Sequence, residues 1–391
     1  MSKHALMLAT SHNDLRAIKA LKQMGFHVVA TGGKSGLVGE QFVDEYFQID
    51  YSEKEEVLKF AETQNIDHIC ACCNDFGVIT ASFVAEKLGL SGHDSYENTL
   101  ILHRKDMFKK FAKEHDIFTP YAECFADENS ALNYIEAVQY PVIVKPSDLS
   151  AGNGISRADS KEQAVIAIRN ALGKSRIKKI VIEPFIDGSQ HGFCTFLINK
   201  KVVAVCSNNE YSFVNPYRVE IDTFPADNFD EVKDFLIGQI EKMAAILNLK
   251  DGIFHLQYRM QDNKPYIMEC MRRTIGNMYG TPAEKHTGIN WDYWQMAVYC
   301  GLDLSGFPKN SRQTNFCAYK TIMAKQNGYV KEIIVPEDIN RFVHDTHFLW
   351  KPENPVQNHM SEPLGFLFMA FPNMETMKNV LLDRYDAICL A

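Results

Sequence analysis

PVIVKPSDLSAGNGIS, residues 141–156, is the stretch of sequence that most narrows the fold. Its apolar start predicts a strand that ends on Lys145, whose ammonium group is too costly to bury without a partner. Lys145 therefore faces solvent or an anion. In the loop that follows, Gly152 and Gly154 flank Asn153, and glycines let main-chain N–H groups approach phosphate oxygens closely. A plain hairpin turn is the alternative, and the lysine directly before the loop favours the anion site.

Strands and helices alternate N-terminal to this segment, over residues 5–89. Such alternation predicts a parallel sheet with helices on both faces, and ligands bind at the carboxyl ends of its strands. Asn74 and Asp75 follow one expected strand and are candidate substrate contacts. The first strand is followed by TSHND, not by G-x-G-x-x-G, which argues against a dinucleotide-binding oxidoreductase.

A second candidate segment is VIEPFIDG, residues 181–188. An acidic residue, Glu183, stands near the end of an apolar strand and is followed by proline, phenylalanine and isoleucine. This pattern suits a hinge whose main chain pairs with an adenine edge while Phe185 and Ile186 pack on the ring. The alternative is an ordinary β-turn.

A third segment, HLQYRMQDNKPYIMECMRR at residues 255–273, predicts a hairpin that turns near residue 262. Counting outward from the turn brings Gln257 and Glu269 roughly opposite each other. Facing oxygen ligands suit Mg²⁺. Arg273 would hold a phosphoryl group or a carboxylate. A surface hairpin with scattered charges is the alternative.

Taken in chain order, these elements resemble the ATP-grasp superfamily. The segment HRKDMFKKFAKEHDIFTP at 103–120 is similar to the helix that carries that family's first lysine, here Lys105. The glycine-containing loop, the hinge and the hairpin resemble its later motifs. The choice of glutamine and glutamate on the hairpin is most similar to carbamoyl-phosphate-synthase-like members.

The resemblance implies a fold class of α/β and α+β. It implies an N-terminal Rossmann-like (pre-ATP-grasp) domain, an ATP-grasp fold of two α+β lobes and a small C-terminal β-rich domain. The expected boundaries are 1–92, 93–310 with a small lobe at about 118–187, and 311–391.

The resemblance also implies roles for individual residues, with ATP and Mg²⁺ as cofactors and Mn²⁺ as an alternative metal. Lys145 and Arg273 would be catalytic, and Gln257 and Glu269 would bind the metal. The residues expected to bind ATP are Lys105, Lys145, Ser150, Gly152, Asn153, Gly154, Glu183, Phe185, Ile186 and Gln190.

The sequence departs from the family pattern at two positions. Gln190 stands where the family has an acidic residue that binds ribose, and its amide still bonds a hydroxyl. Met271 replaces the asparagine of the E-x-N-x-R pattern, and a thioether is a poor ligand for a hard cation. Asn277 is the nearby residue expected to substitute for it.

The function implied is that of an ATP-dependent carboxylate–amine ligase, which forms an amide through an acyl phosphate and releases ADP and phosphate. A carbamoyl-phosphate-synthase-like or purine-pathway ligase is one alternative. A nucleotide-binding regulatory protein without turnover is another, and Met271 motivates it. We expect small-molecule carboxylate and amine substrates, and Arg218 is a candidate contact for a substrate carboxylate.

Composition limits the other classes of partner. The net charge of -8 over 391 residues argues against nucleic-acid binding through a general basic field. No apolar stretch approaches the roughly 20 residues that span a bilayer, so we expect no membrane insertion. Ten scattered cysteines without zinc-site spacing suggest reduced thiols and a cytoplasmic protein. A homodimer is compatible with the sequence.

Overall fold

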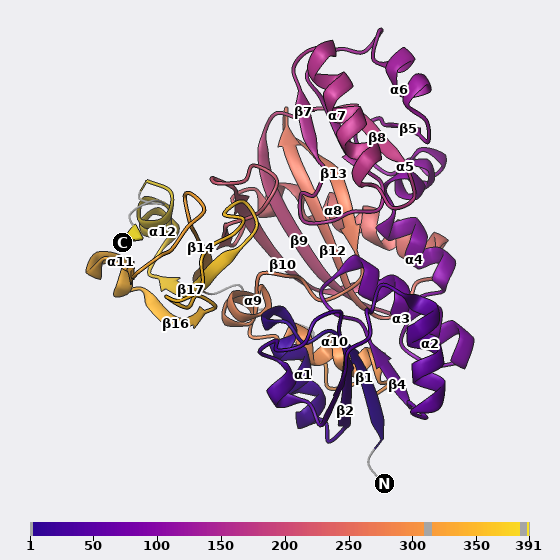
Figure 1. The fold of residues 1–391 in the computed structure, drawn as a ribbon, viewed down its shortest axis with the longest axis vertical. Helices are drawn as coiled ribbons and strands as arrows, with labels where there is room; N and C mark the ends of the chain where they lie inside the picture. The colour runs from indigo at the N-terminus through magenta and orange to yellow at the C-terminus, as the bar shows by residue number, and fades with distance from the viewer. Residues whose placement is uncertain (1–2, 309–314, 384–388, 391) are drawn as a thin grey trace.

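The strands of the computed structural model form four β-sheets within the residues that it describes, which are 3–308, 315–383 and 389–390 (Figure 1). One sheet lies near the N-terminus, one in a small lobe at the opposite end of the molecule, and one long sheet lies between them. A two-stranded sheet joins β15 (Ile333–Ile334) to β18 (Cys389–Leu390).

The N-terminal sheet is parallel, with strand order β3-β2-β1-β4. Its strands are β1 (His4–Leu8), β2 (His27–Thr31), β3 (Glu45–Phe47) and β4 (His68–Cys70). The helices along this part of the chain are η1 (His12–Asp14), α1 (Leu15–Gln23), η2 (Glu40–Phe42), α2 (Lys54–Thr63), α3 (Asp75–Leu88) and α4 (Tyr96–His103). The predicted parallel sheet is therefore present. The name Rossmann-like for this region stays a prediction.

A helix from a distant part of the chain completes the core of this sheet. Met296 and Tyr299 of α10 (Trp291–Tyr299) belong to the same apolar cluster as Leu6 and Ile69. Figure 1 shows α10 beside α1 and β1. Parallel strands need both faces covered, and α10 helps to provide that cover.

The small lobe contains an antiparallel sheet with strand order β5-β8-β6-β7. Its strands are β5 (Glu123–Phe125), β6 (Val142–Pro146), β7 (Ser156–Ala158) and β8 (Ile180–Pro184). Two helices pack on it, α6 (Glu128–Tyr134) and α7 (Lys161–Lys174). Because β6 and β8 are antiparallel neighbours, Lys145 pairs with Val181, two residues before Glu183 and on the same face of the sheet.

The long central sheet is antiparallel, with strand order β13-β12-β9-β10-β11-β14-β17-β16. Its strands are β9 (Ser189–Ile198), β10 (Lys201–Tyr211), β11 (Ile221–Phe224), β12 (Gly252–Gln261), β13 (Lys264–Met271), β14 (Phe316–Met323), β16 (Val343–Phe348) and β17 (Pro363–Phe371). The remaining helices are α5 (Lys105–Glu114), α8 (Phe229–Ile246), α9 (Gly280–Thr287), α11 (Glu337–Asn340) and α12 (Met374–Leu381). Side chains of α5 and α8 join one apolar cluster on this sheet.

Two tight turns in the central sheet confirm the predicted hairpins. Asn199 and Lys200 join β9 to β10 with φ of 51° and 65°. Asp262 and Asn263 join β12 to β13 with φ of 51° and 59°. Positive φ at both central residues is the conformation of two-residue turns that match the twist of paired strands.

The central sheet continues past residue 310. Strand β11 pairs with β14, so the strands from the predicted C-terminal domain extend the sheet that carries the hairpin of Gln257 and Glu269. The three domain boundaries stay predictions.

No helix in the described parts of the chain is both long enough and apolar enough to cross a membrane.

Candidate active site

Lys105 lies where the glycine loop (Ser147–Gly154) approaches the β12–β13 hairpin. Its ammonium group donates to the main-chain oxygen of Leu149 at 2.8 Å and lies 3.7 Å from a carboxylate oxygen of Glu269. Its main-chain N–H also donates to the oxygen of Ser147 at 3.0 Å. The start of α5 is thus bound to the loop, and its first side chain connects the loop to the hairpin.

The conformation of the glycine loop requires its two glycines. Gly152 and Gly154 have φ of +76° and +77°, where other residues are strained. A Cβ atom on Gly152 would also lie 2.8 Å from the main-chain oxygen of Tyr217. The N–H of Asn153 donates to the oxygen of Ser150 at 3.2 Å, which closes a turn at the partly exposed tip. Such a turn leaves other main-chain N–H groups free to bind an anion.

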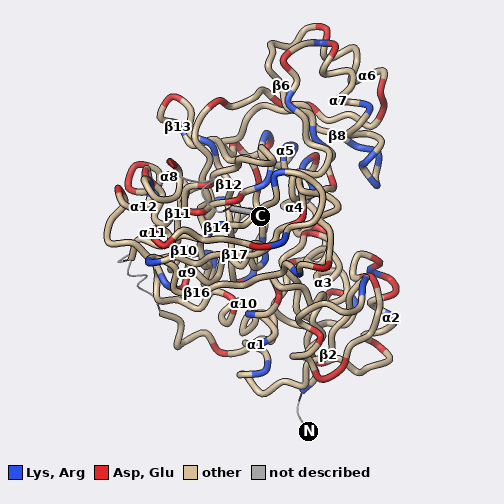
Figure 2. Tube along the Cα trace, turned by 60° about the vertical axis from the view of Figure 1, so that its left-hand side comes forward, with Lys and Arg blue, Asp and Glu red and all other residues tan. Residues whose placement is uncertain are grey.

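A buried cluster of three charges lies beneath this loop. Glu183 on β8 is 2.5 Å from the ammonium group of Lys145 on β6 and 2.9 Å from that of Lys109 on α5. Figure 2 shows basic segments gathered where α5, β6 and β8 meet. Burial alone would raise the pKa of Glu183, but Lys109 and then Lys145 lower it to about 2. The cluster keeps one uncompensated positive charge, which favours an anion nearby.

The contacts of Glu183 differ from its predicted place in an adenine pocket. Its carboxylate is 1% exposed and lies between two lysines, so it acts first as their counter-charge. Phe185 is half-buried beneath the guanidinium of Arg157, 4.3 Å from the ring centre, and Ile186 is buried. The main-chain N–H of Phe185 is bound to the oxygen of Pro141.

The β12–β13 hairpin has the register expected from the sequence. Gln257 pairs directly with Glu269, and a bulge follows at the next position of β12. The amide nitrogen of Gln257 donates to both carboxylate oxygens of Glu210, at 3.1 and 2.9 Å. This orientation leaves the amide oxygen of Gln257 available to a cation, beside the partly exposed carboxylate of Glu269.

Gln190 belongs to the same polar row of the sheet. Its amide nitrogen donates to Glu210 at 2.7 Å, and its amide oxygen accepts from Arg259 at 3.2 Å. The predicted ribose contact is therefore part of a network that also holds Gln257.

Arg273 follows β13 and is held by the N-terminal domain. Its Nε donates to Asp75 at 2.8 Å, and the Nδ1 of His103 lies 3.1 Å from the same carboxylate oxygen. Burial opposes ionisation of Asp75, but Arg273 and then His103 keep its pKa well below the usual range. Arg273 is thus a fixed buried cation, with Asp75 as its counter-charge.

The comparisons with known proteins agree with this geometry. A family model described as the ATP-grasp (A) domain of phosphoribosylglycinamide synthetase matches residues 103–216, which contain both lysines, the glycine loop and the hinge. The phosphoribosylamine–glycine ligase of Haemophilus influenzae is 29% identical over 183 residues, which cover 42% of each chain. The C-terminal section of the carbamoyl phosphate synthase large chain of Methanocaldococcus jannaschii is 22% identical over 280 residues, which cover 67% of this chain and 44% of that relative. The chain thus spans less than half the length of these relatives.

Solved structures match over the whole chain. Phosphoribosylglycinamide synthetase from Anaerococcus prevotii matches with a TM-score of 0.77 and 21% identity, covering 100% of both chains. L-amino acid ligase from Bacillus licheniformis matches with a TM-score of 0.84 and 18% identity, covering 100% of this chain and 98% of that one. Residues 103–216 therefore form an ATP-grasp domain, and the whole chain has the fold of these solved structures.

The side chain of Met271 has a polar partner. Its sulfur accepts from the guanidinium of Arg273 at 3.3 Å. Asn277, the expected substitute ligand, donates its amide nitrogen to the oxygen of Val219 at 3.1 Å and to the hydroxyl of Tyr319 at 3.2 Å. Asn277 is therefore bound toward β11 and β14, and no contact joins it to Glu269.

The three candidate substrate contacts are all engaged within the protein. Asn74 caps α3 by accepting the N–H of Phe76 at 2.9 Å, and Asp75 pairs with Arg273. The guanidinium of Arg218 donates to the main-chain oxygen of Ser361, and burial lowers its pKa. A substrate role for these residues stays a prediction.

Sequence reasoning missed three acidic or basic residues, Lys109, Asp222 and Glu220. Lys109 stands one helical turn after Lys105, so the i, i+4 spacing was an available signal. Asp222 lies on a strand that the sequence left without a function. Glu220 accepts the N–H groups of Phe213, Val214 and Asn215 and thereby fixes the β10–β11 loop.

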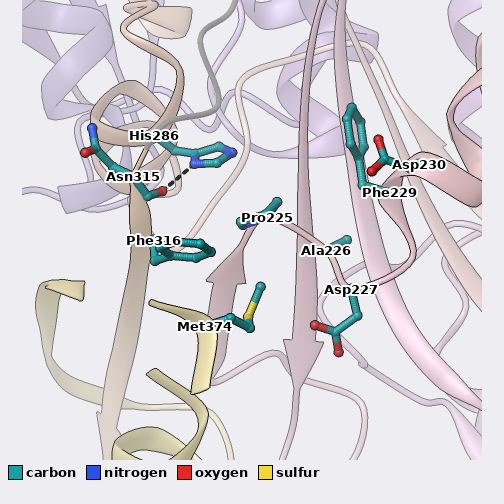
Figure 3. Close-up of a pocket in the computed structure, with 9 residues that line it drawn as sticks. All are labelled: Pro225, Ala226, Asp227, Phe229, Asp230, His286, Asn315, Phe316 and Met374. Carbon is teal, nitrogen blue, oxygen red and sulfur yellow. Dashed lines mark hydrogen bonds between the residues drawn. The ribbon is translucent and has the colours of Figure 1, made fainter. Parts of the chain in front are cut away.

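A separate pocket of about 410 Å³ lies between the end of β11, the start of α8 and the segments of β14 and α12 (Figure 3). Its lining residues are Pro225, Ala226, Asp227, Phe229, Asp230, His286, Asn315, Phe316 and Met374. Nδ1 of His286 is bound to the oxygen of Asn315, and Asp227 pairs with Lys378 outside the predicted site. None of the predicted site residues lines this pocket.

Proposed function

We propose that this ATP-grasp chain is an ATP-dependent ligase that joins a carboxylate to an amine. The carboxylate would become an acyl phosphate, and attack by the amine would give an amide with release of phosphate and ADP. The observation that carries this proposal is the meeting of the glycine loop, Lys105 and Glu269 at one point.

The residues fit a nucleotide with a divalent cation. The glycine loop provides main-chain N–H groups, and the lysine cluster has an excess positive charge for phosphate oxygens. Glu269 and the amide oxygen of Gln257 are hard oxygen donors of the kind Mg²⁺ prefers. Bound ATP would supply the transferable phosphoryl group, and Mg²⁺ would neutralise part of its charge. Mn²⁺ has the same ligand preference.

The protein's contribution is mainly orientation and electrostatics. Lys105 and Lys145 would hold the phosphate oxygens, and Glu183 keeps Lys145 in place. Arg273, fixed by Asp75, would stabilise charge that develops on the transferring group. Phe185, Ile186 and Gln190 would contact the adenine and ribose.

Met271 supports a second candidate function. With a thioether in place of an oxygen ligand at Met271, the second metal position has one oxygen ligand fewer from this segment. A protein that binds ATP and regulates another process without turnover would tolerate this loss. Among enzymes, a carbamoyl-phosphate-synthase-like or purine-pathway ligase is the nearest alternative.

We further propose small-molecule carboxylates and amines as partners, without nucleic acid or membrane, in a cytoplasmic protein that forms homodimers. Several matching solved structures are of proteins that act on small molecules.

The test is magnesium-dependent phosphate release from ATP in the presence of pooled carboxylates and amines. We expect release with at least one pair, and a loss of about 10²-fold or more in Lys145→Ala and in Glu269→Ala. Lys110→Ala is the control, because Lys110 lies on α5 with its side chain 78% exposed. ATP binding without phosphate release for any pair would favour the regulatory function. Full activity in both site variants would overturn the site assignment.

A further inference from the structure

Glu210 and Asp222 face each other on the central sheet. They are directly paired across β10 and β11, and Gln190 and Tyr319 flank them on β9 and β14. Directly paired residues on neighbouring strands point to the same face of a sheet. The two carboxylates therefore lie side by side, with polar groups on both sides.

Neither carboxylate forms an ion pair with a residue that the structure describes, although the guanidinium of Arg259 acts on Glu210 through space. Glu210 is 8% exposed and accepts from the amides of Gln190 and Gln257. Asp222 is 3% exposed, and its Oδ1 accepts no hydrogen bond from any residue that the structure describes. No lysine or arginine in the described ranges lies within 4.0 Å of either carboxylate, whereas Asp75, Glu183 and Asp292 each have such a partner.

A third polar group completes the arrangement. Asn208 is fully buried two residues before Glu210 on β10, so it points to the same face. Its amide lies over Gly192, where a Cβ atom would be 2.4 Å from the amide oxygen. Its amide oxygen accepts from the hydroxyl of Tyr279 at 3.1 Å, so its amide nitrogen is the group that faces the two carboxylates. Burial raises the pKa of Glu210 and Asp222, and Asn208 is close enough to lower both again in part.

The carboxylate pair is next to the proposed metal site. Gln257 binds Glu210 through its amide nitrogen and stands opposite Glu269 on the hairpin. One side chain therefore separates Glu210 from the position at which the phosphoryl group would be transferred.

We propose that Glu210 and Asp222 form the subsite for the ammonium group of the amine substrate. This inference rests on the proposed ligase function, since it assigns the second substrate of the same site. An ammonium group has three N–H donors and one positive charge, which suits two carboxylates side by side. A protein-held metal fits less well, because no three histidine, cysteine, aspartate or glutamate side chains in the described residues are grouped to hold one.

The first experiment measures binding and does not depend on turnover. Thermal unfolding of the full chain is followed in methylammonium chloride, with sodium chloride at equal ionic strength as reference. We expect methylammonium to raise Tm in the wild type and to have no such effect in Asp222→Asn or Glu210→Gln. The control is Asp227→Asn, which changes an exposed aspartate just beyond β11 and should respond like the wild type. Stabilisation by magnesium chloride in place of methylammonium, lost in Asp222→Asn, would make the pair a metal site and overturn the inference.

The second experiment separates this inference from the ligase proposal. Hydroxylamine is an uncharged nucleophile at pH 7 that traps acyl phosphates as hydroxamates. It is compared with the most active amine of the phosphate-release screen. In Asp222→Asn we expect the rate at low amine concentration to fall at least tenfold more than the rate of hydroxamate formation. Equal losses with both nucleophiles would overturn the ammonium subsite. Absence of hydroxamate from the wild type with every carboxylate would overturn the ligase function, and the methylammonium result would still decide the subsite.

Discussion

Two buried groups of charges in this molecule are balanced in opposite ways. In the small lobe, the carboxylate of Glu183 lies between Lys109 and Lys145, so the protein supplies both signs of charge. On the central sheet, Glu210 and Asp222 face each other among amides and the hydroxyl of Tyr319. The first group has an excess of positive groups and the second an excess of acidic groups. The first arrangement satisfies its carboxylate within the protein, while the second is suited to a ligand that brings a cation.

The largest expected loss of stability comes from removing the carboxylate of Glu183, which lies between Lys109 and Lys145. Glu183→Gln leaves two buried lysines without a counter-charge, which costs about 3–5 kcal/mol of unfolding free energy. Urea unfolding at pH 7 measures this loss. Glu128→Gln in the same lobe is the control, because its ion pair with Arg169 is largely exposed and contributes at most about 1 kcal/mol. A loss as small as that of the control would mean that Lys109 and Lys145 do not depend on Glu183.

At Glu210 and Asp222 we expect a smaller effect of the opposite sign, a gain in stability when one carboxylate is removed. Burial, and then Glu210, raises the pKa of Asp222 in the folded chain, so the folded state binds its proton more tightly than the unfolded state. The stability that this proton provides is complete below the unfolded pKa of about 3.9 and declines as pH rises above it. Asp222→Asn removes the decline and should exceed the wild type in stability by about 1–2 kcal/mol at pH 7.

The measurement is urea unfolding of Asp222→Asn and wild type between pH 4 and pH 8. The difference between them should grow as pH rises. For Glu183 the sign is reversed. Its pKa of about 2 lies below the ordinary value, so its contribution is present above pH 4.5 and is lost as pH falls toward 2. A stability difference for Asp222→Asn that does not change with pH would contradict the comparison.

The smallest effect on stability is expected at Glu220, a buried carboxylate that accepts hydrogen bonds from three main-chain N–H groups. Glu220→Gln replaces charge-assisted hydrogen bonds with neutral ones, at a cost of about 1 kcal/mol. Amide hydrogen exchange at residues 213–215 should accelerate by up to about tenfold. Glu362→Gln, which loses similar bonds to Gln357 and Asn358, should accelerate exchange only near residues 357–358. Unchanged exchange at 213–215 would show that other contacts hold the loop.

Much of the fold could be predicted because its signals are local. The turns at Asn199-Lys200 and Asp262-Asn263 fix the register of the strands next to them, so counting brought Gln257 within one residue of Glu269. A bulge between Gln257 and Tyr258 then shifts the pairing onto Glu269. The parallel N-terminal sheet followed from the alternation of strands and helices. The position of α10 against that sheet did not, because its contacts join distant parts of the chain.

The partners of the site residues were harder to predict for the same reason. The contact of Arg273 with Asp75 joins the residue pair after β13 to the start of α3. No spacing in the sequence predicts this contact. Glu210 and Asp222 stand in ordinary strands, where an acidic residue more often faces solvent. Both lie on inner strands of the long central sheet, and that position buries them. Lys109 was within reach of sequence reasoning, since it shares a helix face with Lys105.

The continuity of the central sheet past residue 310 has a consequence for shortened forms of the protein. A chain that ended there would lack β14, β16 and β17, and β11 would become an edge strand with unpaired N–H and C=O groups. Exposed edges of this kind recruit strands from other molecules and promote aggregation. The strands after residue 310 thus protect the solubility of the sheet that carries Glu210 and Asp222.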